Sequence, residues 1–371
     1  MSFKPRRRRL LAGSAAVVLG APALARAQGP ITLRFQSSWP ARSLFHEYAR
    51  DFARKVTEMT GGDVRIEPLA TEGGMPASDL LDAVSKGALD GSHGLLHHHY
   101  GRHPAFGLWA AGPAFGMDAN LLLAWHRYGG GRQLLARLYA AIGADVVSFP
   151  HGPMATQPLG WFRKPITRAQ DLRRLRVRAP GMAGEIYAGL GAQAVAMPPA
   201  ELAEALRGGA LDGAEFNNAA SDRELGLAGA AKVYMLQSYH QSAEQFEILF
   251  NKTKFEALPP KMRAILEAAA DAASADMAWK AIDRYSEAHA RLRAERQVRM
   301  LKTPDAVLQR QLAAYDAAAS KRADDALFRE IQASQRRFAE RAVRWQLDTQ
   351  VSPRLAYGHY FDPKPAQRKR R

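Results

Sequence analysis

The chain of 371 residues contains no cysteine. This absence excludes disulfide bonds, zinc–thiolate sites, iron–sulfur clusters and cysteine nucleophiles. After residue 30, no apolar run approaches the roughly 18 residues that a membrane-spanning helix needs. The phosphate loop G-x-x-x-x-G-K-[ST], the nucleophile elbow G-x-S-x-G and the metalloprotease motif H-E-x-x-H are missing too. The sequence therefore gives no support to a nucleotide-binding enzyme or to covalent catalysis.

The positive charge is concentrated at the two ends of the chain. The formal net charge is +16, of which residues 1–28 supply six charges and residues 364–371 supply five. Subtracting these eleven leaves +5, so the body of the protein is only mildly basic. A short basic tail is usually a solvated end, and we expect no nucleic-acid partner.

The first 27 residues have the order of regions of an export signal. The basic stretch 4–9 is followed by the apolar stretch 10–24 and then by Ala25-Arg26-Ala27. This order predicts a secretory signal peptide over 1–27, cleaved after about Ala27. The arginine block favours the twin-arginine type over an ordinary signal with additional arginines. We expect the mature chain in the periplasm.

Predicted strands and helices alternate along the mature chain. Residues 31–36 and 64–69 have strand patterns, whereas 43–59 and 77–86 have helical ones. This order predicts an α/β fold with a largely parallel sheet and helices on its faces.

Two segments, 81–91 and 203–213, resemble each other. Each consists of a predicted short helix, a glycine stop and a strand with Leu-Asp-Gly. Each leads into an unusual stretch, 92–100 in one case and 214–222 in the other. Although such units also arise by chance, their equivalent positions favour two related lobes. Because ligands bind beyond the carboxyl ends of such strands, we expect both stretches to face one cleft.

The segment from about 258 to 346 is rich in Ala, Arg, Glu and Leu, which predicts long helices. These helices would brace the lobes or form a contact between two subunits.

Five histidines fall between His93 and His103, three of them adjacent at 97–99. Imidazole suits zinc, copper and nickel. On a strand, however, adjacent side chains point to opposite faces, so at most two of the three could share an ion. We therefore expect His97 and His99 on one face, lining the cleft.

Arg178 stands at the end of a predicted strand, on the same face as Arg176, with Val177 facing the core. An arginine so placed can hold a carboxylate through two parallel hydrogen bonds. The alternative is a salt bridge between the lobes.

A wider pattern of residues supports the first interpretation. It comprises Gln157–Ile166, Asp171-Leu172, Arg176–Gly181, Gly184-Glu185, Leu190-Gly191 and Leu211–Glu215, with Ser38–Pro40, Asp90, His93-Gly94, Pro113–Met117 and Tyr128–Gly131 upstream and Lys232–Tyr234 and Phe250–Lys252 downstream. In order and spacing this pattern resembles the solute receptors of tripartite ATP-independent periplasmic (TRAP) transporters. The nearest branch binds 2-oxo and 2-hydroxy monocarboxylates, and the resemblance extends to about residue 350.

The resemblance implies an α/β, two-lobed periplasmic-binding-protein-like fold with a cleft between the lobes and long C-terminal helices. We expect lobe 1 over 28–150, lobe 2 over 151–244, a return to lobe 1 with the long helices over 245–350, and a disordered basic tail over 351–371. The lobes would close on a small organic acid about hinges near 150 and 245. The receptor would pass the acid to membrane permease subunits and perform no catalysis.

The resemblance also implies roles for particular residues. Arg178 matches the arginine that clamps the substrate carboxylate. Gln157 matches a glutamine that contacts the ligand or a bound cation, and Glu215 matches a cation ligand. Phe216 stands where the branch has tryptophan, and Gln241 stands where it has a second glutamate. The lost charge makes calcium less suitable than sodium, and we expect no required cofactor.

Neutral donors and aromatic walls would complete the ligand site. Asn217 and Asn218 would join Gln157 as polar groups, and the walls would come from Trp39, Phe216, Tyr239 and the histidines, His97 in particular. Two alternatives remain at this point. One is a receptor of the same family for a dicarboxylate or a sugar acid. The other is a periplasmic metal-binding protein or enzyme that uses His93–His103.

Overall fold

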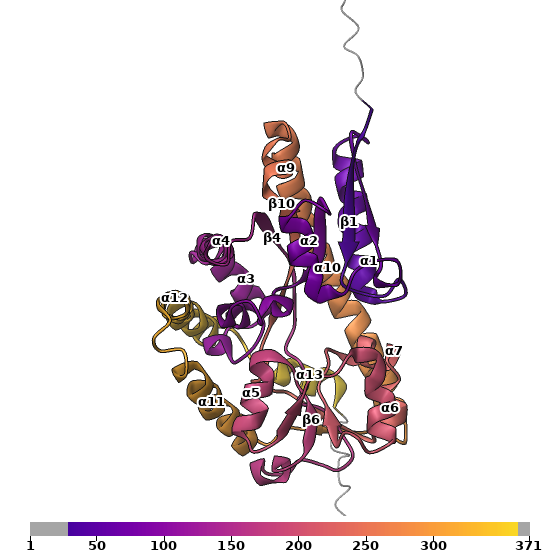
Figure 1. Cartoon of the computed structure of the whole chain (residues 1–371). Helices are drawn as coiled ribbons and strands as arrows, with labels where there is room; N and C mark the ends of the chain where they lie inside the picture. The colour runs from indigo at the N-terminus through magenta and orange to yellow at the C-terminus, as the bar shows by residue number, and fades with distance from the viewer. Residues whose placement is uncertain (1–28, 363–371) are drawn as a thin grey trace, which may run out of the picture.

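Residues 29–362, the part of the chain that the computed structural model describes, form two α/β lobes (Figure 1). The expected two-lobed fold is confirmed. The predicted signal peptide lies outside the described residues. Among the helices of residues 29–362, none combines the length and the apolar character needed to cross a bilayer.

Lobe 1 is built on a five-stranded sheet with the order β2-β1-β3-β10-β4. Its strands are β1 (Ile31–Ser37), β2 (Val64–Leu69), β3 (Gly91–Leu95), β4 (Val146–Met154) and β10 (Glu244–Asn251). Its helices are α1 (Leu44–Met59), α2 (Leu80–Ser85), α3 (Ala119–Tyr128), α4 (Gly131–Ala141) and α9 (Lys252–Glu256). The predicted strands at 31–36 and 64–69 and the helix at 43–59 are confirmed.

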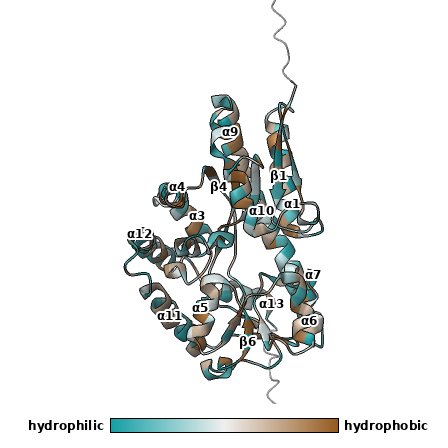
Figure 2. Cartoon of the chain, viewed as in Figure 1, coloured by the Kyte–Doolittle hydropathy of each residue, from teal (hydrophilic) through white to brown (hydrophobic). Residues whose placement is uncertain are grey.

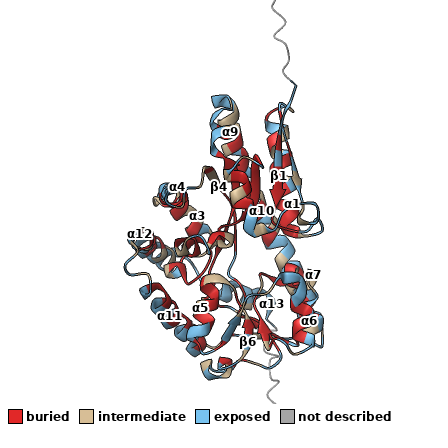
Figure 3. Ribbon diagram, viewed as in Figure 1, coloured by how far each residue is buried: buried red, intermediate tan, exposed pale blue. Residues whose placement is uncertain are grey.

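Lobe 2 is built on a six-stranded sheet with the order β11-β9-β5-β8-β6-β7. Its strands are β5 (Gly160–Phe162), β6 (Arg176–Arg178), β7 (Gln193–Val195), β8 (Gly213–Ala214), β9 (Val233–Leu236) and β11 (Arg299–Lys302). Its helices are α5 (Gly181–Gly189), α6 (Leu202–Arg207), α7 (Ala219–Glu224) and α8 (Leu227–Ala230). Apolar residues gather on the strands and on the helix faces that cover them, and these are the buried parts of each lobe (Figures 2 and 3).

The two sheets repeat one pairing scheme. In lobe 1 the parallel trio β2-β1-β3 is followed by β10 and β4, which join with antiparallel pairings. In lobe 2 the parallel trio β7-β6-β8 is followed by β5, which is antiparallel to β8 and to β9. The expectation of a largely parallel sheet is confirmed, since β10 in lobe 1 and β5 in lobe 2 are the strands that run against the others in residues 29–362. These two strands each enter their lobe from the other one.

The sequence echo corresponds to one structure that occurs in both lobes. In lobe 1 the Asp90 carboxylate accepts from the backbone N–H of Arg34 at 2.6 Å, and the backbone N–H of Asp90 returns to the Arg34 carbonyl at 2.9 Å. In lobe 2 Asp212 makes the same pair of bonds to Arg176, at 2.9 and 2.8 Å. Asp90 thus fixes the start of β3 against β1, and Asp212 fixes the start of β8 against β6. The stretches after β3 and β8 therefore point to the same side of their sheets.

Four segments connect the lobes. The crossing 155–159 joins β4 to β5, and the crossing 237–243 joins β9 to β10. Both lie within a few residues of the expected hinges. The third connection is α10 (Pro260–Ala294), which places Leu266 and Ala270 in the core of lobe 1 and Ala288 and Leu292 in the core of lobe 2. In Figure 1 this helix runs along both lobes.

The fourth connection joins α11 (Asp305–Ser320), which packs on α5 in lobe 2, to α12 (Ala326–Thr349), which packs on lobe 1. Since β11 pairs with β9 and α11 covers lobe 2, the segment 245–350 serves both lobes and does not simply return to lobe 1. The long helices themselves are present, as expected. The expectation of a disordered tail was wrong for α13 (Pro353–Phe361), which is helical; residues 363–371 lie outside the described part.

A buried carboxylate organises the inner face of lobe 1. Glu247 on β10 accepts from the Tyr139 hydroxyl at 2.6 Å and from the Ser148 hydroxyl at 2.8 Å, and it lies 2.6 Å from Nε2 of His99. A buried acceptor that loses a donor costs free energy because water cannot replace it.

We expect Tyr139→Phe to lower the free energy of unfolding by about 1–3 kcal/mol, the range for a buried hydrogen bond to a polar or charged group. The same change at Tyr128, whose side chain is exposed, should alter it by less than about 0.5 kcal/mol. Urea unfolding of both variants measures the difference. Equal stability of the two variants would contradict the role given to Glu247.

Candidate functional site

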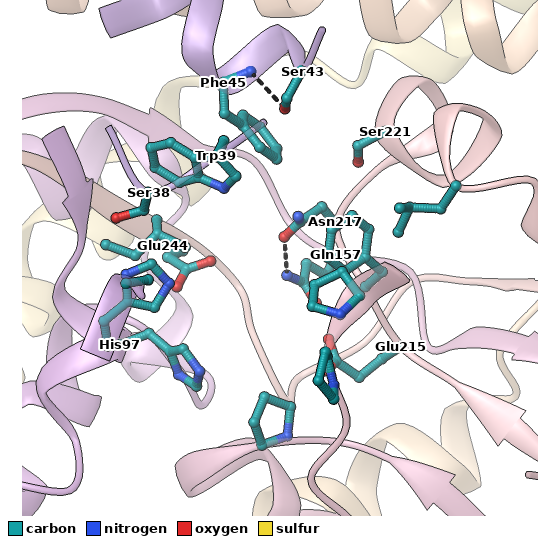
Figure 4. Close-up of a pocket in the computed structure, with 18 of the residues that line it drawn as sticks. Ser38, Trp39, Ser43, Phe45, His97, Gln157, Glu215, Asn217, Ser221 and Glu244 are labelled. Atoms are coloured by element: carbon teal, nitrogen blue, oxygen red, sulfur yellow. Dashed lines mark hydrogen bonds between the residues drawn. The ribbon is translucent and has the colours of Figure 1, made fainter. Parts of the chain in front are cut away.

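A cavity of about 560 Å³ lies between the lobes. Residues from both lobes line it, and Figure 4 shows them on opposing sides of the cleft. The sequence-predicted site residues among them are Trp39, His97, Gln157, Arg178, Glu215, Phe216, Asn217 and Gln241. Both unusual stretches therefore meet here: 92–100 contributes Leu95, His97 and His98, and 214–222 contributes Glu215, Phe216, Asn217 and Ser221.

Arg178 is held at the end of β6 with its guanidinium against the cavity. Its Nε donates to the Met197 carbonyl at 3.3 Å, and Nη1 donates to the carbonyl and to the carboxylate of Glu215 at 3.2 and 2.7 Å. The Phe216 ring lies 5.7 Å from the guanidinium carbon. Within residues 29–362 these contacts use Nε and Nη1, and Nη2 has no hydrogen-bond partner there.

Glu215 is almost fully buried, with 3% of its side chain exposed. Burial alone would raise its pKa, but Arg178 and then His240 outweigh burial and lower the pKa below its usual value. The carboxylate is therefore charged at neutral pH and holds the guanidinium in place. Part of the positive charge of Arg178 is consequently balanced before any ligand arrives.

Gln157 and Asn217 are joined across the floor of the cavity. The Gln157 amide nitrogen donates to Oδ1 of Asn217 at 3.0 Å (Figure 4). The backbone N–H of Asn217 donates to Asp222 at 3.2 Å, and the Trp161 indole donates to the other oxygen of Asp222 at 2.8 Å. These bonds fix two amides against the cavity wall.

Two of the expected polar or aromatic contacts lie elsewhere. The Asn218 side chain accepts from the backbone N–H groups of Ala220 and Ser221 and so caps α7. Tyr239 is part of the crossing 237–243, and the structure does not place it among the residues lining the cavity.

The lobe 1 wall contains Trp39, His97 and His98. Residues 96–99 form a turn of 3₁₀-helix and not a strand. The expected pairing of His97 with His99 was therefore wrong: His97 and His98 face the cavity, whereas His99 points to Glu247. Burial lowers the pKa of His97 to about 4, with a further contribution from Arg178. Burial also lowers the pKa of His98 well below its usual value. Both rings are neutral at physiological pH.

The remaining histidines of the cluster have separate partners. His93 bonds to His151, with 2.6 Å between Nε2 and Nδ1, and His103 lies 3.3 Å from Asp325. Across residues 29–362, no three His, Cys, Asp or Glu side chains come together as metal ligands. The structure therefore gives no support to a transition-metal centre at His93–His103.

Glu244 is a pocket residue that the sequence interpretation missed. It is among the labelled residues of the cavity in Figure 4, begins β10 and is 3% exposed. Its carboxylate accepts from the Gln241 amide at 2.8 Å. Burial raises its pKa to about 8. The only signal in the sequence was its place three residues after Gln241, which does not reveal burial.

The residues that the sequence suggested as cation ligands, Glu215, Phe216, Gln241 and Gln157, all line the cavity. Carboxylate, carbonyl and amide oxygens suit a hard cation such as sodium. Only Glu215 carries a negative charge at neutral pH, and Arg178 already balances it. Calcium sites draw on several negative ligands, so the donors fit a sodium ion better than calcium.

Comparison with known proteins places the chain in a family. Residues 35–323 match the model of bacterial extracellular solute-binding proteins, family 7 (DctP), and the protein belongs to this family of TRAP solute receptors. The chain is 28% identical over 319 residues to a monocarboxylate 2-oxoacid-binding periplasmic protein of Nostoc sp., covering 86% of this chain and 87% of that one.

Two solved structures are similar along their whole length. A TRAP solute-binding protein of Pseudoalteromonas atlantica with bound sodium and pyruvate is 27% identical, with a TM-score of 0.81, over 90% of this chain and 100% of that one. One of Bordetella bronchiseptica, a mixed-occupancy dimer with calcium and picolinate in one site, is 26% identical, with the same TM-score, over 90% and 97%. The receptor family and the fold predicted from the sequence are confirmed.

The raised pKa of Glu244 predicts a dependence of stability on pH. The usual glutamate pKa is 4.5, so the unfolded chain loses this proton first. Stability of the ligand-free protein should fall as the pH rises toward 8. Glu244→Gln removes this contribution. Its free energy of unfolding should therefore rise relative to wild type by about 1.4 kcal/mol per pH unit between about pH 5 and 8.

Urea unfolding of the ligand-free protein at several pH values measures this difference. The control is Glu256→Gln on the surface of α9, which should follow wild type throughout. A constant difference between Glu244→Gln and wild type would contradict the assignment.

Proposed function

We propose that the protein is a periplasmic receptor that binds a small 2-oxo or 2-hydroxy monocarboxylate and delivers it to the permease subunits of a TRAP transporter. The observation that carries this proposal is the fixed guanidinium of Arg178, which lines a cavity between two lobes and whose Nη2 has no hydrogen-bond partner within residues 29–362. A carboxylate that meets a preset guanidinium gains charge-assisted hydrogen bonds without a cost of ordering the arginine.

The other residues that line the cavity are compatible with a small monocarboxylate as the ligand. The neutral amides of Gln157 and Asn217 offer hydrogen bonds, and Trp39, Phe216 and the neutral imidazoles form apolar walls. Arg42 also lines the cavity in the described chain, so the lining alone does not exclude a second carboxylate. The preference for a monocarboxylate rests on the similar proteins, a 2-oxoacid-binding periplasmic protein and a receptor with bound pyruvate, and dicarboxylates and sugar acids are therefore the second choice.

Capture would require the two lobes to close about the crossings 155–159 and 237–243. If a cation accompanies the ligand, Glu215, Gln241 and the Phe216 carbonyl would hold it. Its positive charge would offset the Glu215 carboxylate, which already pairs with Arg178. We infer that the protein acts as a receptor without catalysis, because the family to which the chain belongs consists of solute-binding proteins.

Arg178→Ala tests the proposal directly. We expect it to reduce carboxylate binding by about 2–5 kcal/mol, since the bound anion would lose its paired charge in a buried site. Titration calorimetry with pyruvate, lactate, a dicarboxylate and a sugar acid, each with and without sodium and calcium, measures the loss and identifies the ligand class.

The matched control is Arg176→Ala on the same strand. Arg176 faces Asp212 and not the cavity, so this variant should bind as wild type does. Binding by wild type that survives in Arg178→Ala would place the clamp elsewhere. The absence of binding to every carboxylic acid by wild type would overturn the proposed function itself.

We also propose that two copies pair through their C-terminal helices. Leu355, Tyr357, Tyr360 and Phe361 make α13 strongly apolar, and all four are exposed. In the described chain no residue of α13 is buried. The receptor of Bordetella bronchiseptica forms a dimer, which makes a second copy the partner that fits this helix.

Leu355→Asp combined with Phe361→Asp should convert the dimer to a monomer, because two charges would be buried in an apolar interface. Light scattering after size-exclusion chromatography measures the mass. Leu69→Asp, an exposed leucine on β2, is the control and should leave the dimer intact. A monomeric wild type would refute the pairing.

A further inference from the structure

His240 lies behind the cavity wall, on the crossing 237–243, and its side chain is fully buried. Its Nε2 lies 3.1 Å from Oε1 of Gln157 and 3.6 Å from Oε2 of Glu215. One imidazole therefore contacts two of the residues that face the ligand. The crossing begins at Gln237, whose φ of +67° is in the left-handed region that non-glycine residues rarely adopt. This backbone setting aims the following residues inward.

The partners of Ser238 determine which nitrogen of His240 carries the hydrogen. The Ser238 hydroxyl oxygen accepts from the backbone N–H of His240 at 3.0 Å and from the Gln311 amide at 2.9 Å. A hydroxyl oxygen has two acceptor lone pairs, so both are used. Its own hydrogen has two acceptors within reach, Nδ1 of His240 and Oε1 of Gln311 at 3.3 Å. Nδ1 is the nearer of the two, and Oε1 already accepts from the backbone N–H of Tyr239, so the hydroxyl donates to Nδ1. Nδ1 is thus an acceptor, and Nε2 bears the hydrogen.

The orientation of Gln311 is itself fixed. Its amide oxygen accepts the backbone N–H of Tyr239 at 2.9 Å, so its nitrogen must face Ser238. Gln311 belongs to α11 and is fully buried. The chain of bonds consequently runs from a helix of lobe 2, through the crossing, to the wall of the cavity.

The Nε2–H of His240 donates to the oxygen of the Gln157 amide. This sets the amide with its oxygen toward His240 and its nitrogen toward Asn217, to which one N–H donates at 3.0 Å. Gln157 lines the cavity, and its second N–H is the polar group left for a ligand.

We propose that His240 is a positioning residue, held as the Nε2–H tautomer by Ser238 and Gln311, that makes Gln157 a hydrogen-bond donor to the bound acid. This inference rests on the proposed function and sharpens it. A donor at Gln157 selects an acceptor oxygen, as in a carboxylate or a 2-oxo group. It also assigns Gln157 to the ligand and removes it from the cation ligands, two roles that the sequence left open.

Nitrogen-15 NMR of the imidazole side chains in the intact wild-type protein tests the tautomer. The spectrum of His240→Asn identifies the His240 signals by their disappearance. We expect a protonated Nε2 and an unprotonated Nδ1 for His240. The opposite tautomer, or hydrogens on both nitrogens, would overturn the proposal whether or not a ligand has been found.

A double-mutant cycle tests the action through Gln157. Pyruvate affinity is measured by calorimetry for wild type, His240→Phe, Gln157→Ala and the double variant. We expect His240→Phe to weaken binding about tenfold and the double variant to bind within twofold of Gln157→Ala. Such non-additivity arises when one residue acts through the other. Additive losses, or unchanged affinity of His240→Phe, would refute the positioning role.

The control is His126→Phe, which replaces another buried histidine, in α3, and should lower the melting temperature without changing affinity. Should His240→Phe fail to fold, Ser238→Ala provides the second route, because it frees the imidazole to adopt either tautomer. We expect it to shift the NMR pattern of His240 and to weaken pyruvate binding. An unchanged pattern and unchanged affinity would contradict the proposal. Failure of wild type to bind any carboxylic acid would instead count against the proposed function, while the tautomer result still stands.

Discussion

The ion pair between Arg178 and Glu215 is the interaction that organises the cavity between the lobes. A buried ion pair contributes little net stability, because desolvation of both charges offsets their attraction. Its value here is organisational. Glu215 holds the guanidinium against the cavity, and Phe216 covers its face. Because Glu215 already balances part of the charge, an anion bound as proposed would need further attraction from the neutral amides or from an accompanying cation.

The repeated architecture of the lobes brings the pieces of this site together. Asp90 makes the same hydrogen bonds to β1 that Asp212 makes to β6. The segments after β3 and β8 therefore leave their sheets in equivalent ways. One segment supplies the imidazoles and the other supplies Glu215 and its neighbours. The site therefore results from two similar strand ends that face each other across the cleft.

Much of this could be predicted from the sequence. Alternation and helical spacing identified β1, α1 and β2, and the Leu-Asp-Gly echo identified the two strand ends. The position of Arg178 at a strand end, together with the family pattern, placed it at the cavity that it lines. Apart from the family pattern, which extends over most of the chain, these signals are local.

Other features depended on contacts between distant parts of the chain. The 97–99 histidines gave no sign that a tight helical turn would separate His99 from its neighbours. The burial of Glu244 and the partners of His240 arise from elements that meet only in the folded protein, so spacing could not reveal them. The apolar side chains of α13 were obscured by the basic residues that follow, and the whole segment resembled a solvated end.

The placement of α10 affects how the protein unfolds. A single helix supplies Leu266 and Ala270 to one core and Ala288 and Leu292 to the other. If the core of one lobe unfolds, half of α10 loses the residues against which it packs. The other half, which belongs to the core of the second lobe, is then held less firmly. The two lobes are thereby coupled into one cooperative unit, even though each has a complete sheet of its own. Partial unfolding of one lobe alone is therefore disfavoured.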